Sequence, residues 1–194
     1  FTEDQEHIIV GYTDAYSKSA LIVACKDGKV MWQKSLEYDA FHRNSEIAGV
    51  RGIGIVGIFQ QMKDSKKTAV YLNLFDWNGN LKWSLPLETR GDMVIKIAEN
   101  IEKVYVISTS GYIWCIDAIH GTMLWKSKEP WSPNPYEKKP WSWEVPMFRE
   151  LEVKNDNVFV IGKQGSPWHS STLIIFVGKT GELLKKIEYP HDLI

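Results

Sequence analysis

Residues 115–125 read CIDAIHGTMLW and end in the pattern Gly-x-x-x-Trp. The pattern occurs three times in the chain, and a fourth copy has Lys where the Trp would stand; the copies are Gly28–Trp32, Gly79–Trp83, Gly121–Trp125 and Gly181–Lys185. Each copy follows a run of apolar residues that favour β-strands. A strand–turn–strand unit that recurs in this way is typical of a repeat architecture, in which each unit is stabilised by packing on its neighbours.

Between the motifs, short apolar runs alternate with turn residues, which predicts an all-β fold with three or four antiparallel strands in each repeat. We expect one domain over 1–194, made of repeats at about 7–38, 47–88, 92–128 and 148–189. In this prediction the first repeat lacks its innermost strand. In the second repeat we expect strands at 51–61, 68–75 and 80–87, and we expect no buried strand at EIAGVR, 46–51.

Composition excludes several classes of protein. The net charge is −1, so no basic surface is expected to attract nucleic acid. No apolar run approaches the roughly 18–20 residues that a membrane-spanning helix needs, so we expect no membrane span. Hydrophobic residues make up 44% and charged residues 24%, which favours a folded core over disorder. Cys25 and Cys115 fall in predicted strands of different repeats, so we expect two buried free thiols and no disulfide bond.

Residues 115–125 resemble the tryptophan-docking motif of the quinoprotein-dehydrogenase-like (PQQ-like) β-propellers, Ala-x-Asp-x-x-Thr-Gly-x-x-x-Trp. Asp117, Gly121 and Trp125 match, while Cys115 and His120 replace the Ala and the Thr. The resemblance implies a β-propeller-like fold of about four antiparallel blades.

The resemblance also implies that each motif Trp packs against the neighbouring blade. The residues to which it assigns this docking role are Trp32, Trp83, Trp125, Gly28, Gly79, Gly121, Gly181 and Asp117. Complete rings of this family usually have seven or eight blades. Three alternatives therefore stay open: a closed ring of four blades, a piece of a larger propeller, or a half-ring that a homodimer completes.

The catalytic members of the family hold pyrroloquinoline quinone beneath a vicinal Cys–Cys pair, together with calcium. This chain has no Cys-Cys, so we expect no cofactor and no bound metal. The segment DWNGN at 76–80 is not followed by the Gly and the more distant Glu that complete a calcium loop, and a hairpin turn explains it better. The string GIGIVG at 52–57 has the spacing of a dinucleotide-binding motif, but no suitable helix follows, and an inner strand is the better interpretation.

The strongest candidate for a ligand site is the aromatic, Pro-rich insertion at 129–146, together with a second loop near 164–170. Rigid aromatic side chains bind sugars, peptides or cations at little entropic cost. The candidate ligand-binding residues are Trp131, Tyr136, Trp141, Trp143, Trp168 and His169. The alternative is that these rings pack onto the scaffold as structure.

From these residues we expect a non-catalytic module that binds a protein or a glycan. A carbohydrate-active hydrolase or lyase that uses loop carboxylates is one alternative, and a fragment of a larger propeller is the other. The resemblance and the absence of an initiator Met at Phe1 favour a periplasmic or extracellular location, with the cytoplasm left open.

Overall fold

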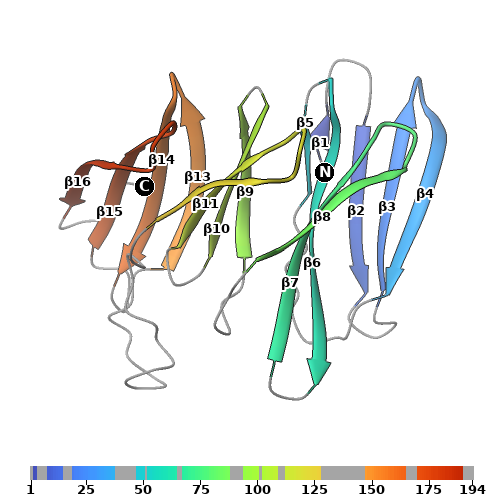
Figure 1. Ribbon diagram of the computed structural model, residues 1–194, viewed down its shortest axis with the longest axis horizontal. Coiled ribbons are helices and arrows are strands. Elements are labelled where there is room, and N and C mark those ends of the chain that lie inside the picture. The colour runs from blue at the N-terminus through green and yellow to red at the C-terminus, as the bar shows by residue number, and fades with distance from the viewer. Residues whose placement is uncertain are drawn as a thin grey trace. The chain divides into compact units, whose positions relative to one another are not determined.

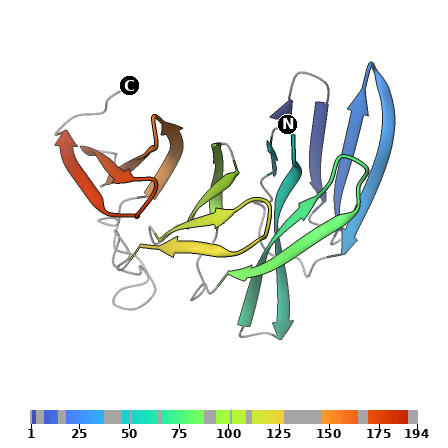
Figure 2. The ribbon, with the colours of Figure 1, turned by 45° about the horizontal axis from the view of Figure 1, so that its top comes forward.

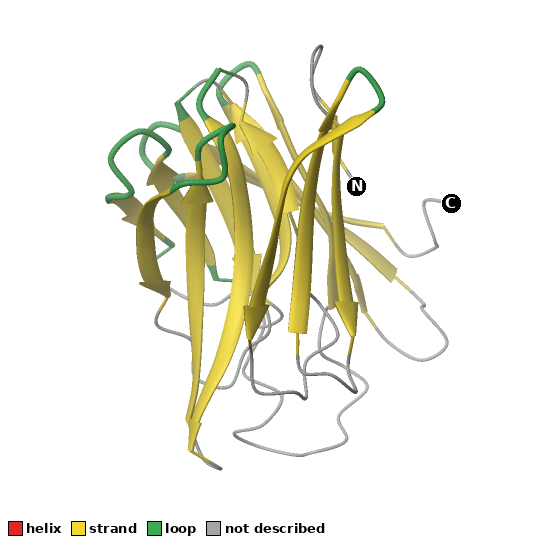
Figure 3. Ribbon diagram, turned by 90° about the vertical axis from the view of Figure 1, so that its right-hand side faces the viewer, coloured by secondary structure: helices red, strands yellow, loops and turns green. Residues whose placement is uncertain are grey.

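The computed structural model describes residues 2–3, 8–14, 19–37, 47–50, 52–64, 67–87, 94–100, 102–108, 112–127, 147–164 and 170–189. In these ranges the chain forms strands and turns and no helix, so the predicted all-β class is confirmed (Figure 3). The chain divides into two compact units. Unit 1 is 1–93 with 101–103 and 117–122, and unit 2 is 94–100, 104–116 and 123–194.

The strands form four sheets of four strands each, and within each sheet the strands lie side by side in chain order (Figure 1). The first sheet contains β1 (Thr2–Glu3), β2 (Ile8–Asp14), β3 (Ser19–Lys26) and β4 (Lys29–Glu37). The second contains β5 (Ile47–Val50), β6 (Gly54–Asp64), β7 (Lys67–Phe75) and β8 (Leu81–Leu87). The third contains β9 (Val94–Asn100), β10 (Lys103–Ser108), β11 (Ile113–Asp117) and β12 (Met123–Lys126). The fourth contains β13 (Met147–Lys154), β14 (Asn157–Gln164), β15 (Ser170–Val177) and β16 (Leu183–Tyr189).

Two expectations about the inner strands were wrong. The first sheet does have a fourth strand, because the two-residue β1 pairs with β2. The second sheet has β5 at Ile47–Val50, where no buried strand was expected, and its last two residues are buried. The short length of both strands explains the error, since neither is long enough to show a strand periodicity.

The glycine string at 52–57 forms a turn and the beginning of β6, and it opens no helix, so a dinucleotide-binding motif is excluded. Gly52 adopts a positive φ of 74°, and Ile53 N donates to Val50 O at 2.9 Å. Gly54 is required for a different reason: a Cβ there would lie 2.0 Å from the backbone oxygen of Phe75. The backbone of β6 thus approaches that of β7 more closely than any side chain would permit.

Every sheet has a one-residue register shift between its third and outermost strands, just before the Trp position. In the first sheet Cys25 pairs with Val30 but Ala24 pairs with Trp32, so Met31 is an extra residue. Similar shifts make Lys82, Leu124 and Leu184 the extra residues of the other sheets. Such a β-bulge reverses which face the following side chains occupy. Trp32 therefore lies on the face of Ala24, which is fully buried, and not on the opposite face.

Each compact unit has its own hydrophobic cluster. In unit 1, Ala24, Ile55 and Phe75 are buried, with Trp32 and Trp77 packed against them. In unit 2 the cluster joins the third and fourth sheets, with Trp125 packed against it. Its buried members are Tyr105, Ile107, Ile113, Cys115, Val158, Val160, Ile174 and Phe176. Cys25 and Cys115 form no disulfide bond with each other, as expected; Cys115 is buried, but Cys25 is only partly buried, so the expectation that both thiols are buried was wrong for Cys25.

Candidate interaction surfaces

The motif tryptophans lie against hairpin turns of the following repeat. The indole Nε1 of Trp32 donates to Trp77 O at 2.7 Å, and that of Trp83 donates to Ala118 O at 2.9 Å. In unit 2, Trp125 Nε1 donates to Gly178 O at 2.9 Å. Each of these bonds joins residues at least 35 positions apart in sequence.

The glycines of the motif provide the space beneath these rings. A Cβ on Gly79 would lie 2.8 Å from Trp32 Cδ2, and a Cβ on Gly121 would lie 2.5 Å from Trp83 Cγ. Gly181 is related in the same way to Trp125, at 2.6 Å from Cε3. Since real Cβ contacts are essentially never below 3.0 Å, only Gly fits under each indole.

The first copy of the motif differs from the other three at its Gly. No atom of the described residues lies within 4 Å of a Cβ built on Gly28, so none of the described indoles rests on it. Its turn is a two-residue hairpin in which Asp27 and Gly28 have φ of 51° and 72°, the positive values that such a tight turn requires. The other turns are longer; for example, Gly121 N donates to Asp117 O, four residues earlier.

Aspartates hold two of the longer turns in shape. Asp117 Oδ1 accepts the backbone N–H groups of Ile119 and His120, both at 2.8 Å, and lies 3.2 Å from His120 Nδ1. The hydrogen bond from the backbone of His120 lowers the pKa of Asp117 most, and it outweighs the effect of partial burial.

Asp76 does the same in the turn at 76–80. Its Oδ1 accepts from Asn78 N and Asn80 N at 2.9 Å each. Burial alone would raise the pKa of Asp76, but the hydrogen bonds from Asn80 and Asn78 lower it overall. The segment is thus a hairpin turn, as expected. The role of Asp76 was missed because Asp76 precedes its Gly by three residues, whereas Asp117 precedes its Gly by four.

Gly178 joins the third and fourth sheets in unit 2. Its carbonyl oxygen accepts from Trp125 Nε1 and also from the Tyr105 hydroxyl at 3.3 Å. Its own N–H donates to Asp156 O at 2.6 Å, which ties the β13–β14 and β15–β16 turns together. Burial of the Tyr105 hydroxyl raises the pKa of this side chain. Neither Gly178 nor Tyr105 could be assigned this role from a local sequence pattern.

An aromatic cluster on the third sheet was also missed. Tyr112 and Trp114 have ring centroids 6.0 Å apart, and Lys126 Nζ lies 4.4 Å from the Tyr112 centroid and 5.4 Å from that of Trp114. Lys126 and Trp114 are cross-strand neighbours on β12 and β11. The ammonium group is therefore held over two aromatic rings within the sheet.

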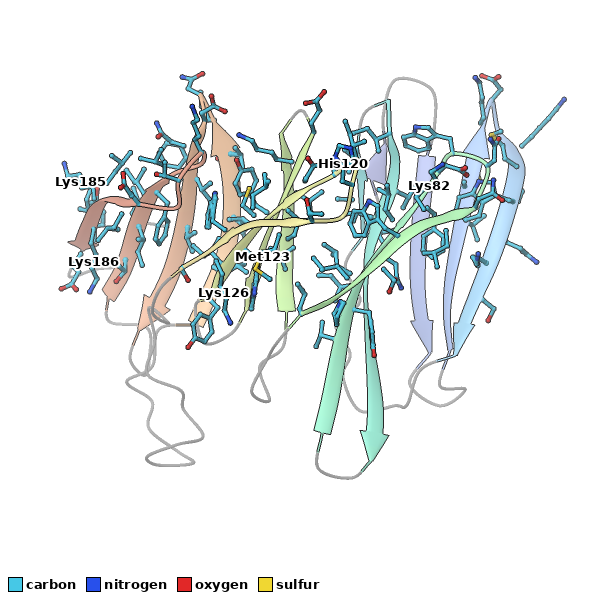
Figure 4. The ribbon with its side chains drawn as sticks, in the orientation of Figure 1. Lys82, His120, Met123, Lys126, Lys185 and Lys186 are labelled. Atoms are coloured by element: carbon cyan, nitrogen blue, oxygen red, sulfur yellow. The ribbon has the colours of Figure 1, made fainter. Side chains whose placement is uncertain are left out.

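Apolar side chains are exposed on the outermost strands at the same place in each repeat, immediately after the glycine turn. They are Val30, Met31, Leu81, Met123, Leu124, Leu183 and Leu184, with exposed fractions between 43 and 61%. Single exposed apolar residues are ordinary, and these lie on edge strands beside lysines that disfavour edge-to-edge pairing. Figure 4 shows Lys82, Lys185 and Lys186 on two of these strands.

The predicted ligand-binding residues lie outside the described residues, namely Trp131, Tyr136, Trp141, Trp143, Trp168 and His169. The strands from which their segments leave are described. Met147, which follows the first segment, pairs with Lys163, and Gln164 pairs with Ser170 on either side of the second. Both segments therefore connect to the same end of the fourth sheet. The β15–β16 turn with Gly181 is at the other end.

Over the described ranges, no group of three or more His, Cys, Asp or Glu side chains has the arrangement of a metal site. In the same ranges no helix has the length and hydropathy needed to cross a membrane.

No protein-family model matches the sequence, and no curated protein matches it. Solved structures do match. The WD40 β-propeller domain of Doa1 aligns with 97% of this chain at a TM-score of 0.56 and 15% identity. The fold is that of a β-propeller. Apo AztD from Citrobacter koseri aligns with 98% of the chain (TM-score 0.58, 12% identity), and BamB from Moraxella catarrhalis with 96% (TM-score 0.55, 13% identity).

These matches confirm the expected resemblance at the level of the fold, with four-stranded antiparallel sheets as blades. The chain covers 52% of the Doa1 domain, 46% of AztD and 62% of BamB, so it spans about half the length of these structures.

Proposed function

We propose that this chain is a non-catalytic β-propeller module that binds a protein or a glycan through the aromatic segments at 129–146 and 164–170. The observation that carries the proposal is the connection of both segments to one end of the fourth sheet, where Met147 pairs with Lys163 and Gln164 with Ser170. Binding residues are often carried by loops whose ends a rigid scaffold positions.

The sheet to which both segments connect is anchored to the third sheet. Gly178 receives two hydrogen bonds from residues of the third sheet, so the fourth sheet is held at its opposite end. Loops on such a framework are free to vary in sequence while their ends stay fixed. A periplasmic or extracellular location stays a prediction. As a partner, we also propose a second copy of this chain.

Binding is tested with two defined probe sets, an oligosaccharide array and a phage-displayed peptide library. We expect wild-type protein to select members of one set, and Trp141→Ala or Trp131→Ala to lose at least about tenfold in affinity, because aromatic anchors dominate such interfaces. Leu184→Ala is the matched control, since it removes an exposed apolar side chain elsewhere. Equal binding by wild type and Trp141→Ala would refute the assignment of the site.

A stability measurement separates the site from the alternative that the rings are structural. The proposal requires Trp141→Ala to melt at the wild-type temperature. A large decrease in the melting temperature would mean that the ring packs onto the scaffold, and that binding must be sought elsewhere.

A further inference from the structure

The fourth sheet buries one face and leaves the other partly exposed. Val158, Val160, Ile174 and Phe176 are buried against the third sheet. Residues that alternate with them point to the opposite face. We call this the fourth-sheet face; its apolar members, each half-buried, are Phe159, Ile161, Leu173, Ile175 and Ile187. Strands that are apolar on both sides are typical of sheets covered on both faces.

The docking residue is missing on this same face. Lys185 stands at the Trp position of the fourth repeat and pairs with Ile175, so it lies at the edge of the fourth-sheet face. It is exposed, and Figure 2 shows its strand, β16, at the edge of the sheet. The contact that covers this face must therefore differ from the Trp–Gly contacts within the chain.

The charges on the face have a definite order. Cross-strand register places Glu152, Phe159, Ile175 and Lys185 in one row from β13 to β16. The row begins with an exposed acidic residue, continues through two apolar residues and ends with an exposed basic one. One neighbouring row again begins with an exposed acidic residue, Glu150, and the other begins with an exposed basic residue, Lys154.

The charges of this row are complementary to those of an identical row that runs in the opposite direction. Rotation by 180° about an axis parallel to the strands keeps each residue at its height along the strand and exchanges β13 with β16. Glu152 of each copy then lies opposite Lys185 of the other, and Phe159 lies opposite Ile175. An axis perpendicular to the strands would instead bring the two β16 edges, with their lysines, together.

We propose that the fourth-sheet face packs against the same face of a second copy of this chain, about a twofold axis parallel to the strands. This deepens the self-association proposed above and does not depend on the ligand. Face-to-face sheets pack about 10 Å apart, a separation that the apolar side chains of both copies fill. The contact is isologous, so each dimer contains two Glu152–Lys185 pairs.

The test is sedimentation velocity of the full chain at protein concentrations up to about 100 μM, the range in which an interface of modest size associates. We expect a concentration-dependent dimer. Lys185→Glu and Glu152→Lys each weaken it by at least about tenfold, because each places like charges opposite one another. The double variant, with both charges reversed, restores the dimer.

Lys186→Glu is the matched control. Lys186 is adjacent and exposed but pairs with Ile174, so it lies on the opposite face, where it contacts Glu188 at 2.6 Å. We expect it to leave the dimer unchanged. Figure 4 labels both lysines on β16. Ile175→Glu is expected to abolish the dimer. Because this substitution can also disturb folding, the test is decided by the exposed variants Lys185→Glu and Glu152→Lys.

Two results would overturn the inference, and they differ in what they imply. A dimer that responds equally to Lys185→Glu and Lys186→Glu uses another surface, so self-association would stand without this interface. A monomer at every concentration would refute self-association as well as this interface.

Discussion

Replacing Gly121 with Ala should cost far more stability than replacing Gly28, although both glycines have nearly the same φ, 68° and 72°. A Cβ in this left-handed region costs roughly 1–2 kcal/mol at either position. At Gly28 we expect no further loss of stability, because no atom of the described residues lies within 4 Å of the added Cβ. At Gly121 the Cβ would stand 2.5 Å from Trp83 Cγ, so the indole must move by about 1 Å to reach van der Waals distance.

Displacing the indole has two further costs. Overpacking of this kind costs about 1–3 kcal/mol, and loss of the bond from Trp83 to Ala118 O adds about 1 kcal/mol. We therefore expect Gly121→Ala to lower the free energy of unfolding by about 3–6 kcal/mol, against about 1–2 kcal/mol for Gly28→Ala. The assay is urea denaturation followed by circular dichroism, with both residues in unit 1.

A double-mutant cycle tests the reasoning. In a Trp83→Ala background the indole is absent, so Gly121→Ala should cost only the backbone strain, as Gly28→Ala does. Equal losses for Gly121→Ala and Gly28→Ala in the wild-type background would refute the claim that the glycine makes room for the ring. So would a cost of Gly121→Ala that does not change when Trp83 is removed.

Three other expectations concern single sites. Gly54→Ala should destabilise the fold by about 3 kcal/mol or more and so lower the melting temperature markedly, because its Cβ would lie 2.0 Å from the Phe75 backbone oxygen. An unchanged melting temperature would show that β6 can shift to make room. Trp125→Ala should cost about 3 kcal/mol through lost packing and the Gly178 bond, and wild-type denaturation would contradict the contact. The pKa of Asp117 in the folded protein lies below its ordinary value of 3.8. The carboxylate therefore contributes to folding stability at pH values above 3.8, and this contribution is lost as the pH falls through the folded pKa. Melting curves should therefore show a smaller acid destabilisation for Asp117→Asn than for wild type, and parallel profiles would count against it.

The repeat pattern predicted most of the strands because each is a local feature. For example, β4 at Lys29–Glu37 lies within the repeat predicted at 7–38, and β14 at Asn157–Gln164 lies within the repeat predicted at 148–189. The spacing between Gly and Trp is local too, so the recurring unit was visible in the sequence. By contrast, β1 and β5 are two and four residues long, and only their partners identify them as strands.

The contacts of the turns were harder to predict, because identical motifs fold differently. Gly28 and Gly121 occupy the same place in the Gly-x-x-x-Trp pattern, yet only Gly121 lies under an indole. The distance from the preceding Asp is the signal that separates them. Asp27 is adjacent to its Gly and forms a tight hairpin, whereas Asp117 precedes its Gly by four residues and holds a wider turn. The contact of Tyr105 with Gly178, 73 residues away, has no such local signal.

The register shift before each Trp position has a consequence for how this chain can change over time. Because Met31 is an extra residue between Val30 and Trp32, deleting one residue there would turn the ring to the opposite side of its sheet. Substitutions at that position alter only an exposed side chain. Changes of length in the outer strands should therefore be much rarer among related sequences than changes of residue, while the long connections at the other end of the sheets stay free to vary in both.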